Sequence, residues 1–337
     1  MAGRNGNVSG AGGTGVDRGV VDWLLEPDQP AVRYYALVDL LGRKPEDPEV
    51  RRALAEIPRR GWGADLLGAL QPSGLWEEKE PRNVQAYVDF LYQPKYVSSN
   101  WKALVVSDLG LTSSQPKIRR LAERFFEYKL RLGSPFNYFH EEVCVSGNTA
   151  RILTRFGYGD DRRVRMLFDW LVEDQREDGG WNCSQGTPGT LDGWEAMAAF
   201  AALPPSARTG RIEKAIDRGA EFYLDRGLFR EGKSYPPWRR LHYPNHYYYD
   251  ILVGLDFLTR LGYGGDRRLQ PALQILQEKR QRDGSWLLER VHPDAAGSSA
   301  QPYLKKVKPF ALEEPGQPSK WITLQALRVL KRVEDAS

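Results

Sequence analysis

Four side chains of this sequence are candidate zinc ligands. They are the thiols of Cys144 and Cys183, the carboxylate of Asp192 and the imidazole of His246. Zn²⁺ takes ligands of these types, either four in a closed site or three with one open position. We therefore expect a zinc site built on Cys144 and Cys183, with Asp192 or His246 as a further ligand. The opposing interpretation is that the two cysteines are small buried core residues.

A second histidine competes for the ligand role. His242 lies four residues before His246, which would place both on one face of a helix. Pro244 stands between them and argues against a helix there. His242 is therefore an alternative ligand to His246.

Carboxylates close to these residues are the candidate catalytic groups. A carboxyl group buried in an apolar cavity has a raised pKa and can act as a general acid. We expect Glu195 or Asp250 to handle protons or to orient the histidine, and Asp192 is a further candidate. Glu141 and Glu142 are two more acids of the same kind. The alternative is that each of them is a surface or helix-capping carboxylate.

Aromatic residues gather between positions 236 and 249 and suggest a pocket wall. We expect Trp194, Trp238 and Tyr247, together with His242, to line a cavity for an apolar substrate. Aromatic side chains are also ordinary core material, so packing alone is the competing interpretation.

An internal repeat tells which elements must position these residues. Leu153 to Gly159 (LTRFGYG) leads to DGGW ending at Trp181, and Leu258 to Gly264 (LTRLGYG) leads in the same register to DGSW ending at Trp286. The two copies are 105 residues apart, and a fainter third copy ends at Trp76, again 105 residues before Trp181. A fixed period of this kind is typical of repeat architectures.

Each repeat reads as helices separated by two turns. The Gly-Tyr-Gly segment predicts a helix stop and a turn, with an acidic residue restarting the next helix. The following apolar spacing is helical, and the Asp-Gly-Gly-Trp segment predicts a second turn. We expect an all-α chain of about six helical hairpins, with a last helix over residues 321–333. The hairpins form either an open solenoid or a closed α/α barrel, in which turns at one end converge on a shared rim.

The Gln175 to Trp181 run (QREDGGW) resembles the Gln-Trp motif of the squalene-cyclase and prenyltransferase repeat superfamily, and Gln281 to Trp286 resembles a shortened copy. The resemblance covers roughly residues 20–333 and extends to bacterial prenyltransferase-like proteins. It implies a single α/α toroid domain, residues 19–337, with inner helices around a central cavity. Residues 1–18 are expected to be a disordered Gly-rich leader.

The same resemblance implies a zinc site with one departure. Asp192 and His246 fall where the prenyltransferase β-subunits have two zinc ligands, but Trp194 stands where their ligand cysteine would be. Cys144 and Cys183 then resemble the two-cysteine, one-histidine site of lanthionine cyclase toroids. The Asp-x-Asp-Asp acid of squalene-type cyclases is missing from the chain.

Composition narrows the function classes. The 48 basic and 44 acidic residues leave a net charge of only +4, which does not indicate a nucleic-acid partner. No run of 18 apolar residues predicts a membrane span, and no apolar signal core is present. Only two cysteines are present, too few and too far apart in the sequence for a disulfide scaffold, which suits the reducing cytoplasm.

These features together predict an enzyme that acts on an apolar, isoprenoid-type small molecule in a central aromatic-lined cavity, with Zn²⁺ as cofactor. Two alternatives stay open. One is a non-catalytic toroid that binds a lipid or a peptide of a partner protein. The other is a metal site that only pins the hairpins together.

Overall fold

The computed structural model describes residues 18–77, 99–128, 142–184, 186–231, 235–246, 248–291 and 311–337. The expected all-α class is confirmed, because these residues form helices and their only β features are three isolated bridges. The predicted leader falls outside the described residues except for Arg18, which begins helix α1 (Arg18–Leu24). Among the described helices, none is long and apolar enough to cross a lipid bilayer.

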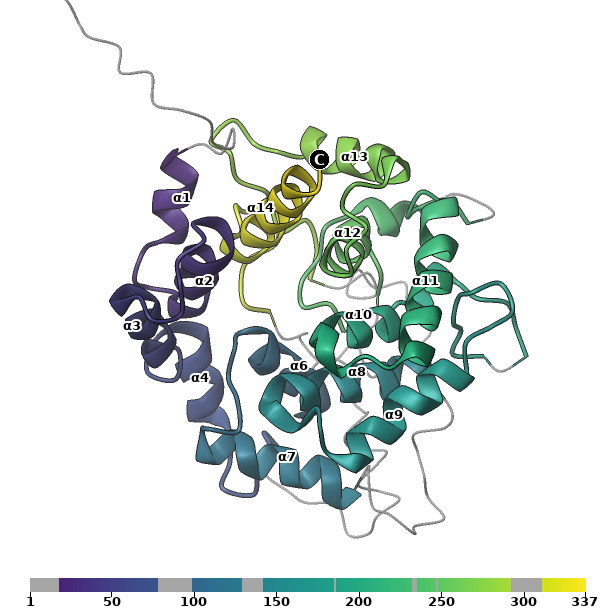
Figure 1. Cartoon of the computed structure of the whole chain (residues 1–337). Coiled ribbons are helices and arrows are strands. Elements are labelled where there is room, and N and C mark those ends of the chain that lie inside the picture. The colour runs from purple at the N-terminus through teal and green to yellow at the C-terminus, as the bar shows by residue number, and fades with distance from the viewer. Residues whose placement is uncertain are drawn as a thin grey trace, which may run out of the picture.

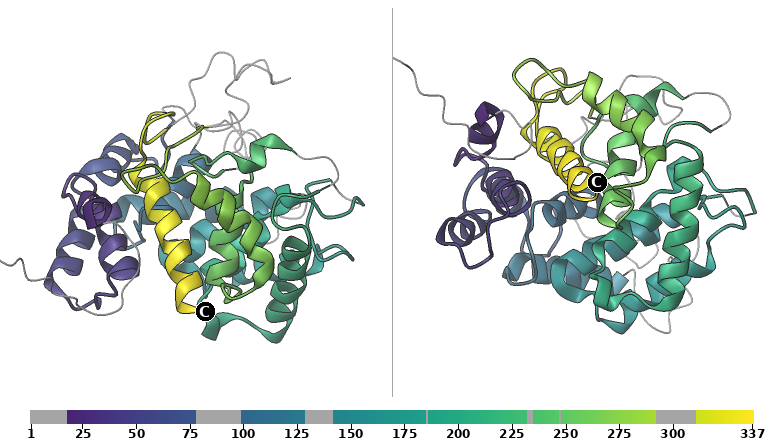
Figure 2. Two further views of the ribbon diagram at one scale, coloured as in Figure 1. Left: turned by 90° about the horizontal axis from the view of Figure 1, so that it is seen from above. Right: turned by 45° about the horizontal axis from the view of Figure 1, so that its top comes forward.

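Six helices form an inner row (Figures 1 and 2). They are α2 (Pro30–Tyr35), α6 (Ser99–Asp108), α8 (Val143–Leu153), α10 (Glu195–Ala202), α12 (Ile251–Arg260) and α14 (Lys320–Asp335). In this row α6, α8, α10, α12, α14 and α2 pack in that order, each against the next. Helix α14 contacts both α12 and α2, so the last described helix packs against one of the first. Helices such as α10 are apolar on nearly every side, as burial on all faces requires.

An outer row of helices covers the inner one (Figure 1). Its members are α3 (Pro48–Glu56), α4 (Gly61–Ala69), α7 (Pro116–Tyr128), α9 (Arg162–Glu173), α11 (Gly210–Asp225) and α13 (Gln270–Glu278). Helices α7, α9 and α11 are one-sided, with one apolar face turned inward and a charged face outward. The short π-helical turns are Ala36–Leu40 and Thr154–Tyr158, and the 3₁₀ turns are Leu191–Gly193, Pro205–Ala207, Pro236–Arg239 and Arg267–Leu269.

The 105-residue repeat is confirmed as a structural repeat by its three tryptophans. The indole N–H of Trp76, Trp181 and Trp286 each donates to the backbone carbonyl ten residues earlier, near the end of the preceding outer helix, at 2.9, 2.8 and 2.7 Å. The glycine two residues before each tryptophan has a φ of 86°, 90° and 86°, which favours glycine at that turn position. The tryptophan therefore supplies a donor that the unpaired carbonyls of a helix end need.

The first turn of the repeat also forms as predicted. Gly157 and Gly262 both have a φ of 100°, and each ends the helix before it. Asp161 and Asp266 then cap the next helix by accepting the backbone N–H two residues later, at 2.9 and 2.8 Å. The last helix runs from Lys320 to Asp335, slightly longer than the predicted 321–333.

Charged residues also join α14 to residues close to the first described helices. The Lys320 ammonium of α14 lies 2.7 Å from a Glu26 carboxylate oxygen and 2.6 Å from one of Asp28. Farther along α14, Arg328 lies 2.8 Å from Asp39. These contacts connect residues almost 300 positions apart and hold α14 against the first helices.

Candidate metal centre and central cavity

The candidate metal centre is built at the start of α8, where that helix crosses α10. A Cβ placed on Gly147 would lie 2.7 Å from the backbone carbonyl of Glu195, so only glycine allows this close approach. The crossing places the N-terminal end of α8, with Cys144, beside the start of α10, with Glu195. Both side chains are fully buried there.

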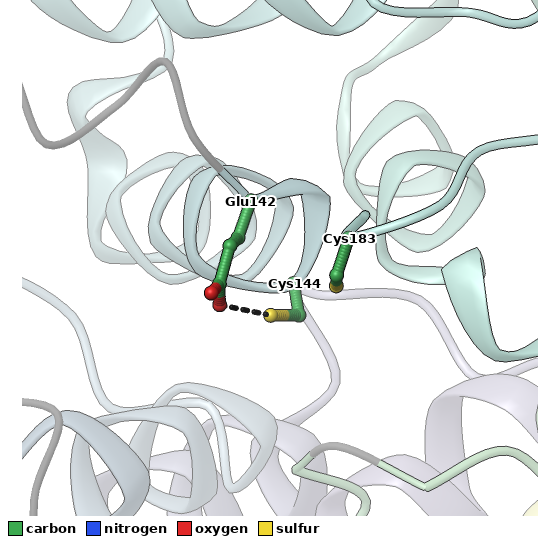
Figure 3. Close-up of side chains that lie close together, drawn as sticks. All are labelled: Glu142, Cys144 and Cys183. Carbon is green, nitrogen blue, oxygen red and sulfur yellow. Dashed lines mark hydrogen bonds between the residues drawn. The ribbon is translucent and has the colours of Figure 1, made fainter. Parts of the chain in front are cut away.

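Two thiols and one carboxylate converge at this end of α8 (Figure 3). The Sγ atoms of Cys144 and Cys183 and a carboxylate oxygen of Glu142 all lie within 4.8 Å of one another. Cys183 arrives from the turn after Trp181, and the Cys144 thiol donates to Glu142 Oε2 at 3.4 Å. Cys144 is buried, whereas Cys183 and Glu142 are half-buried.

The chemistry of these three donors fits a metal ion. Zn²⁺ binds thiolate sulfur at about 2.3 Å and carboxylate oxygen at about 2.0–2.2 Å, which puts tetrahedral ligands roughly 3.5–3.8 Å apart. A contraction of about 1 Å would therefore bring the group to a bonding arrangement. Two sulfur donors favour a soft or borderline ion and disfavour Mg²⁺ and Ca²⁺. Glu142, Cys144 and Cys183 can hold such an ion.

Burial and mutual contacts shift the protonation of this region. A hydrogen bond shared with Cys183, together with burial, raises the pKa of the Cys144 thiol well above its usual value. Burial, and then the nearby Cys183, raises the pKa of Glu195 well above its usual value. Neither carboxylate oxygen of Glu195 has a hydrogen bond to another described residue. A fully buried acid without such a bond is the kind of group that a bound ion or ligand explains.

Asp250 orients a histidine, and that histidine is His242. The carboxylate Oδ2 of Asp250 lies 2.7 Å from His242 Nδ1 and accepts the His242 backbone N–H at 3.0 Å. Its other oxygen caps α12 by accepting the backbone N–H of Val253 at 3.0 Å. The ring is therefore fixed with Nδ1 toward Asp250. The other nitrogen, Nε2, is buried and makes no hydrogen bond to a described residue.

Asp192 and His246, the expected further ligands, are not in the group around the cysteines. Asp192 accepts the indole N–H of Trp238 at 3.0 Å. Burial raises the pKa of Asp192, and hydrogen bonds from Trp238 and the backbone of Tyr249 partly offset this rise. The His246 ring packs against Trp101 with ring centroids 5.2 Å apart, and burial lowers its pKa well below the usual value. Among the described residues, Glu142 is the carboxylate that forms a group with both thiols at distances suited to metal ligands.

The predicted pocket residues divide between two places. Trp194 is buried and lines the central cavity, whereas Trp238 lies outside its lining and is bound to Asp192. His242 is buried beside Asp250. Tyr247 and Glu141 lie outside the described residues.

A cavity of about 430 Å³ lies at the centre of the inner row. Every inner helix contributes to its wall, and the apolar part of the wall includes Tyr34, Tyr35, Ala198, Ala201, Phe257 and Trp321. Its polar part contains four arginines, Arg151, Arg155, Arg260 and Arg328, and two aspartates, Asp108 and Asp256. The cavity is therefore aromatic, as expected, and also cationic.

One face of α8 links the cavity to the metal centre. Cys144, Asn148 and Arg151 are spaced by four and three residues, which places them on the same side of the helix. A separation of seven residues corresponds to about 10 Å along the helix axis. A ligand in the cavity near Arg151 is thus within about 10 Å of the thiols.

Sequence patterns alone did not predict that four arginines line the cavity, or that Glu142 is a candidate metal ligand. Arg155 and Arg260 stand 105 residues apart, at the same place in the two strong repeats, so the period marks both as inward-facing positions. Glu142 was predicted only as a candidate catalytic acid. Its position two residues before Cys144 did not indicate that the two side chains share a site. Comparison with known protein families and with curated proteins found no match for this chain.

Proposed function

We propose that this protein is an α/α toroid that binds one zinc ion through Glu142, Cys144 and Cys183, and that it is an enzyme whose substrate occupies the central cavity. The observation that carries the proposal is the convergence of both cysteines of the chain with a carboxylate on a cavity-lining helix. The toroid is supported by the contact of α14 with α2 and by the cavity wall shared among all six inner helices.

The donor set supports zinc in a catalytic arrangement. Three protein ligands leave a fourth position open, and zinc so held lowers the pKa of a water or thiol bound there. Burial raises the pKa of Glu195 well above its usual value, which favours the protonated acid as a proton donor to a group beside Cys183. Asp250 holds His242 by its Nδ1, which leaves Nε2 as the ring nitrogen that can accept a hydrogen bond from a ligand.

The substrate class that we propose is an apolar, isoprenoid-type small molecule. The aromatic and alanine side chains of the cavity wall support it, since such surfaces bury hydrocarbon. Trp194 is part of that wall and adjoins Glu195, which connects the cavity to the metal centre.

A structural role for the metal is the second candidate. It is favoured by the origin of the ligands, because the start of α8 and the turn after Trp181 are separate segments that a metal would pin together. If the metal is only structural, removing it with a chelator should lower the melting temperature sharply. Metal-free protein that is folded at a lower temperature should then still bind its ligand. In the catalytic case chelation abolishes turnover at temperatures at which the protein stays folded.

The experiment that tests the ligand set compares two carboxylates. Glu142→Gln should weaken zinc binding by at least about tenfold in a competitive chelator titration. Asp192→Asn is the matched control, because its carboxylate is half-buried but bound to Trp238, and it should leave the zinc affinity unchanged. Loss of affinity in the Asp192 variant with none in the Glu142 variant would show that the ligands are assigned wrongly.

A further inference from the structure

The guanidinium group of Arg151 differs from the other arginines of the central cavity. Arg155 is paired with Asp108, and Arg260 lies 3.1 Å from Asp256. Arg328 lies 2.8 Å from Asp39. Three of the four guanidinium groups therefore have a carboxylate within ion-pair distance.

Arg151 has no such carboxylate within the described parts of the chain. Its NH2 donates to Asn148 Oδ1 at 3.1 Å and to the backbone carbonyl of Asn245 at 3.3 Å, both neutral acceptors. Its Nε is buried without a hydrogen bond. The residue is only 5% exposed, yet burial lowers its pKa only to about 10, so it carries its charge at neutral pH.

The acidic group that most affects the pKa of Arg151 is the buried Glu195, but no ion pair joins the two side chains. A buried cation with so little charge compensation is costly, and a structure that keeps one needs a further compensating group. Stacking over Trp194, with the guanidinium carbon 5.0 Å from the ring centre, compensates in part. Arg151 is also one of the residues that line the cavity. A guanidinium fork matches the oxygens of a carboxylate or a phosphate group better than any other common ligand.

The size and the lining of the rest of the cavity indicate what the remaining part of that ligand is like. A volume of about 430 Å³ falls in the range of small-molecule sites and exceeds what a bare inorganic anion fills. The small side chains of Ala198 and Ala201 on α10 leave space for such a ligand, and Tyr34 and Phe257 provide apolar walls.

We propose that the central cavity binds an organic anion, with its carboxylate or phosphate group held by Arg151 and its apolar body packed against the aromatic and alanine wall. The inference rests on the proposed function only in taking this cavity as the ligand site, since binding does not require the metal. It adds a charged end to the apolar substrate proposed above. The head group would lie about 10 Å along α8 from Cys144.

Calorimetric titration with a matched set of ligands tests this proposal. Octanoate and octyl phosphate carry the two possible head groups, and 1-octanol has the same chain without charge. Wild-type protein should bind at least one of the two anions more tightly than the alcohol, and the tighter anion identifies the head group. Running the titrations with and without a chelator separates this outcome from that of the metal proposal.

Two variants and a control locate the site. Arg151→Met should weaken binding of the preferred anion by at least about tenfold and leave octanol unaffected. Arg124→Met is the control, because Arg124 is equally buried, at 6% exposed, but lies outside the cavity. Ala201→Phe fills the cavity without a change of charge, so it should weaken all three ligands. The variants are checked for native circular dichroism.

The proposal is overturned if folded wild-type protein prefers octanol to both anions. It is equally overturned if Arg151→Met binds the preferred anion as tightly as the Arg124 control does. Should Arg151→Met fail to fold, unchanged anion binding by Ala201→Phe would refute the cavity as the site.

Discussion

Replacing Asp256 by asparagine tests the charge balance of the central cavity. Asp256 accepts hydrogen bonds from Arg260 on its own helix at 3.1 Å and from Arg332 on α14 at 3.0 Å. Burial alone would raise the pKa of Asp256, but Arg260, Arg332 and Arg328 hold it well below the usual 3.8. Asparagine has nearly the same shape as aspartate but carries no charge. The variant therefore leaves the guanidinium groups of Arg260, Arg332 and Arg328 without the carboxylate that balances their charge.

The size of the effect follows from the burial of the pair. Breaking a fully buried ion pair costs about 3–5 kcal/mol, and breaking an exposed one about 0–1 kcal/mol. The Asp256 side chain is 24% exposed, which places the expected loss near 2 kcal/mol. An unfolding entropy of about 2.1 cal/mol/K per residue converts this loss to a melting temperature lowered by about 3 °C.

The direction in which the stabilisation by Asp256 changes with pH follows from its lowered pKa. Because the pKa of Asp256 is depressed in the folded protein, its stabilisation is complete above the ordinary pKa of 3.8 and is lost as the pH falls below it. The difference in melting temperature between wild type and Asp256→Asn should therefore be constant from about pH 6 to 8 and shrink below about pH 4. The variant should also bind octyl phosphate more tightly, since the cavity gains a net positive charge.

Thermal unfolding followed by circular dichroism measures these quantities. Asp335→Asn is the control, because Asp335 is paired with Lys331 at 3.3 Å on the surface, and its loss should cost at most about 0.5 kcal/mol. An Asp256 variant as stable as wild type at pH 7, or a difference that grows as the pH falls, would refute this account of the cavity charges.

Three further substitutions test the repeat, the helix crossing and the chain closure. Trp181→Phe should lower the unfolding free energy in urea by about 3 kcal/mol, because the Leu171 carbonyl loses its donor and the smaller ring leaves a void. An effect below about 1 kcal/mol would mean that the indole bond is dispensable. Gly147→Ala should destabilise the protein although alanine favours helices by about 1 kcal/mol, because its Cβ would meet Glu195; a stabilised variant contradicts the crossing. Lys320→Met should lower the melting temperature slightly, by the equivalent of about 1 kcal/mol at low salt and less in high salt, and a salt-independent loss would point to packing instead of charge.

The sequence predicted the helical repeat well because the repeat is encoded locally. The glycine at positive φ and the tryptophan two residues later define the same turn in each copy, and both act on residues no more than ten positions away. The acidic caps Asp161 and Asp266 are likewise read from their own neighbourhood. Such features depend on backbone geometry over one or two turns, which spacing reveals.

The candidate site was predicted only in part because it depends on contacts between distant segments. The pairing of Cys144 with Cys183 was expected, and the two thiols lie together. The sequence could not show which carboxylate lies beside the thiols, because tertiary packing decides it. Asp192 accepts a hydrogen bond from Trp238, whereas Glu142 accepts one from Cys144. Nor does a sequence show that Arg151, unlike the other cavity arginines, forms no ion pair with a described carboxylate.

The measurement that tests the central claim most directly is the zinc content of protein purified without a histidine tag, determined by elemental mass spectrometry. Wild type would be compared with Cys144→Ser and Cys183→Ser, each checked for native helical content. The account predicts about one zinc ion per wild-type chain and its loss from both variants, because each removes one of three ligands. Wild-type protein without metal after incubation with zinc, or serine variants that keep a full equivalent, would contradict it.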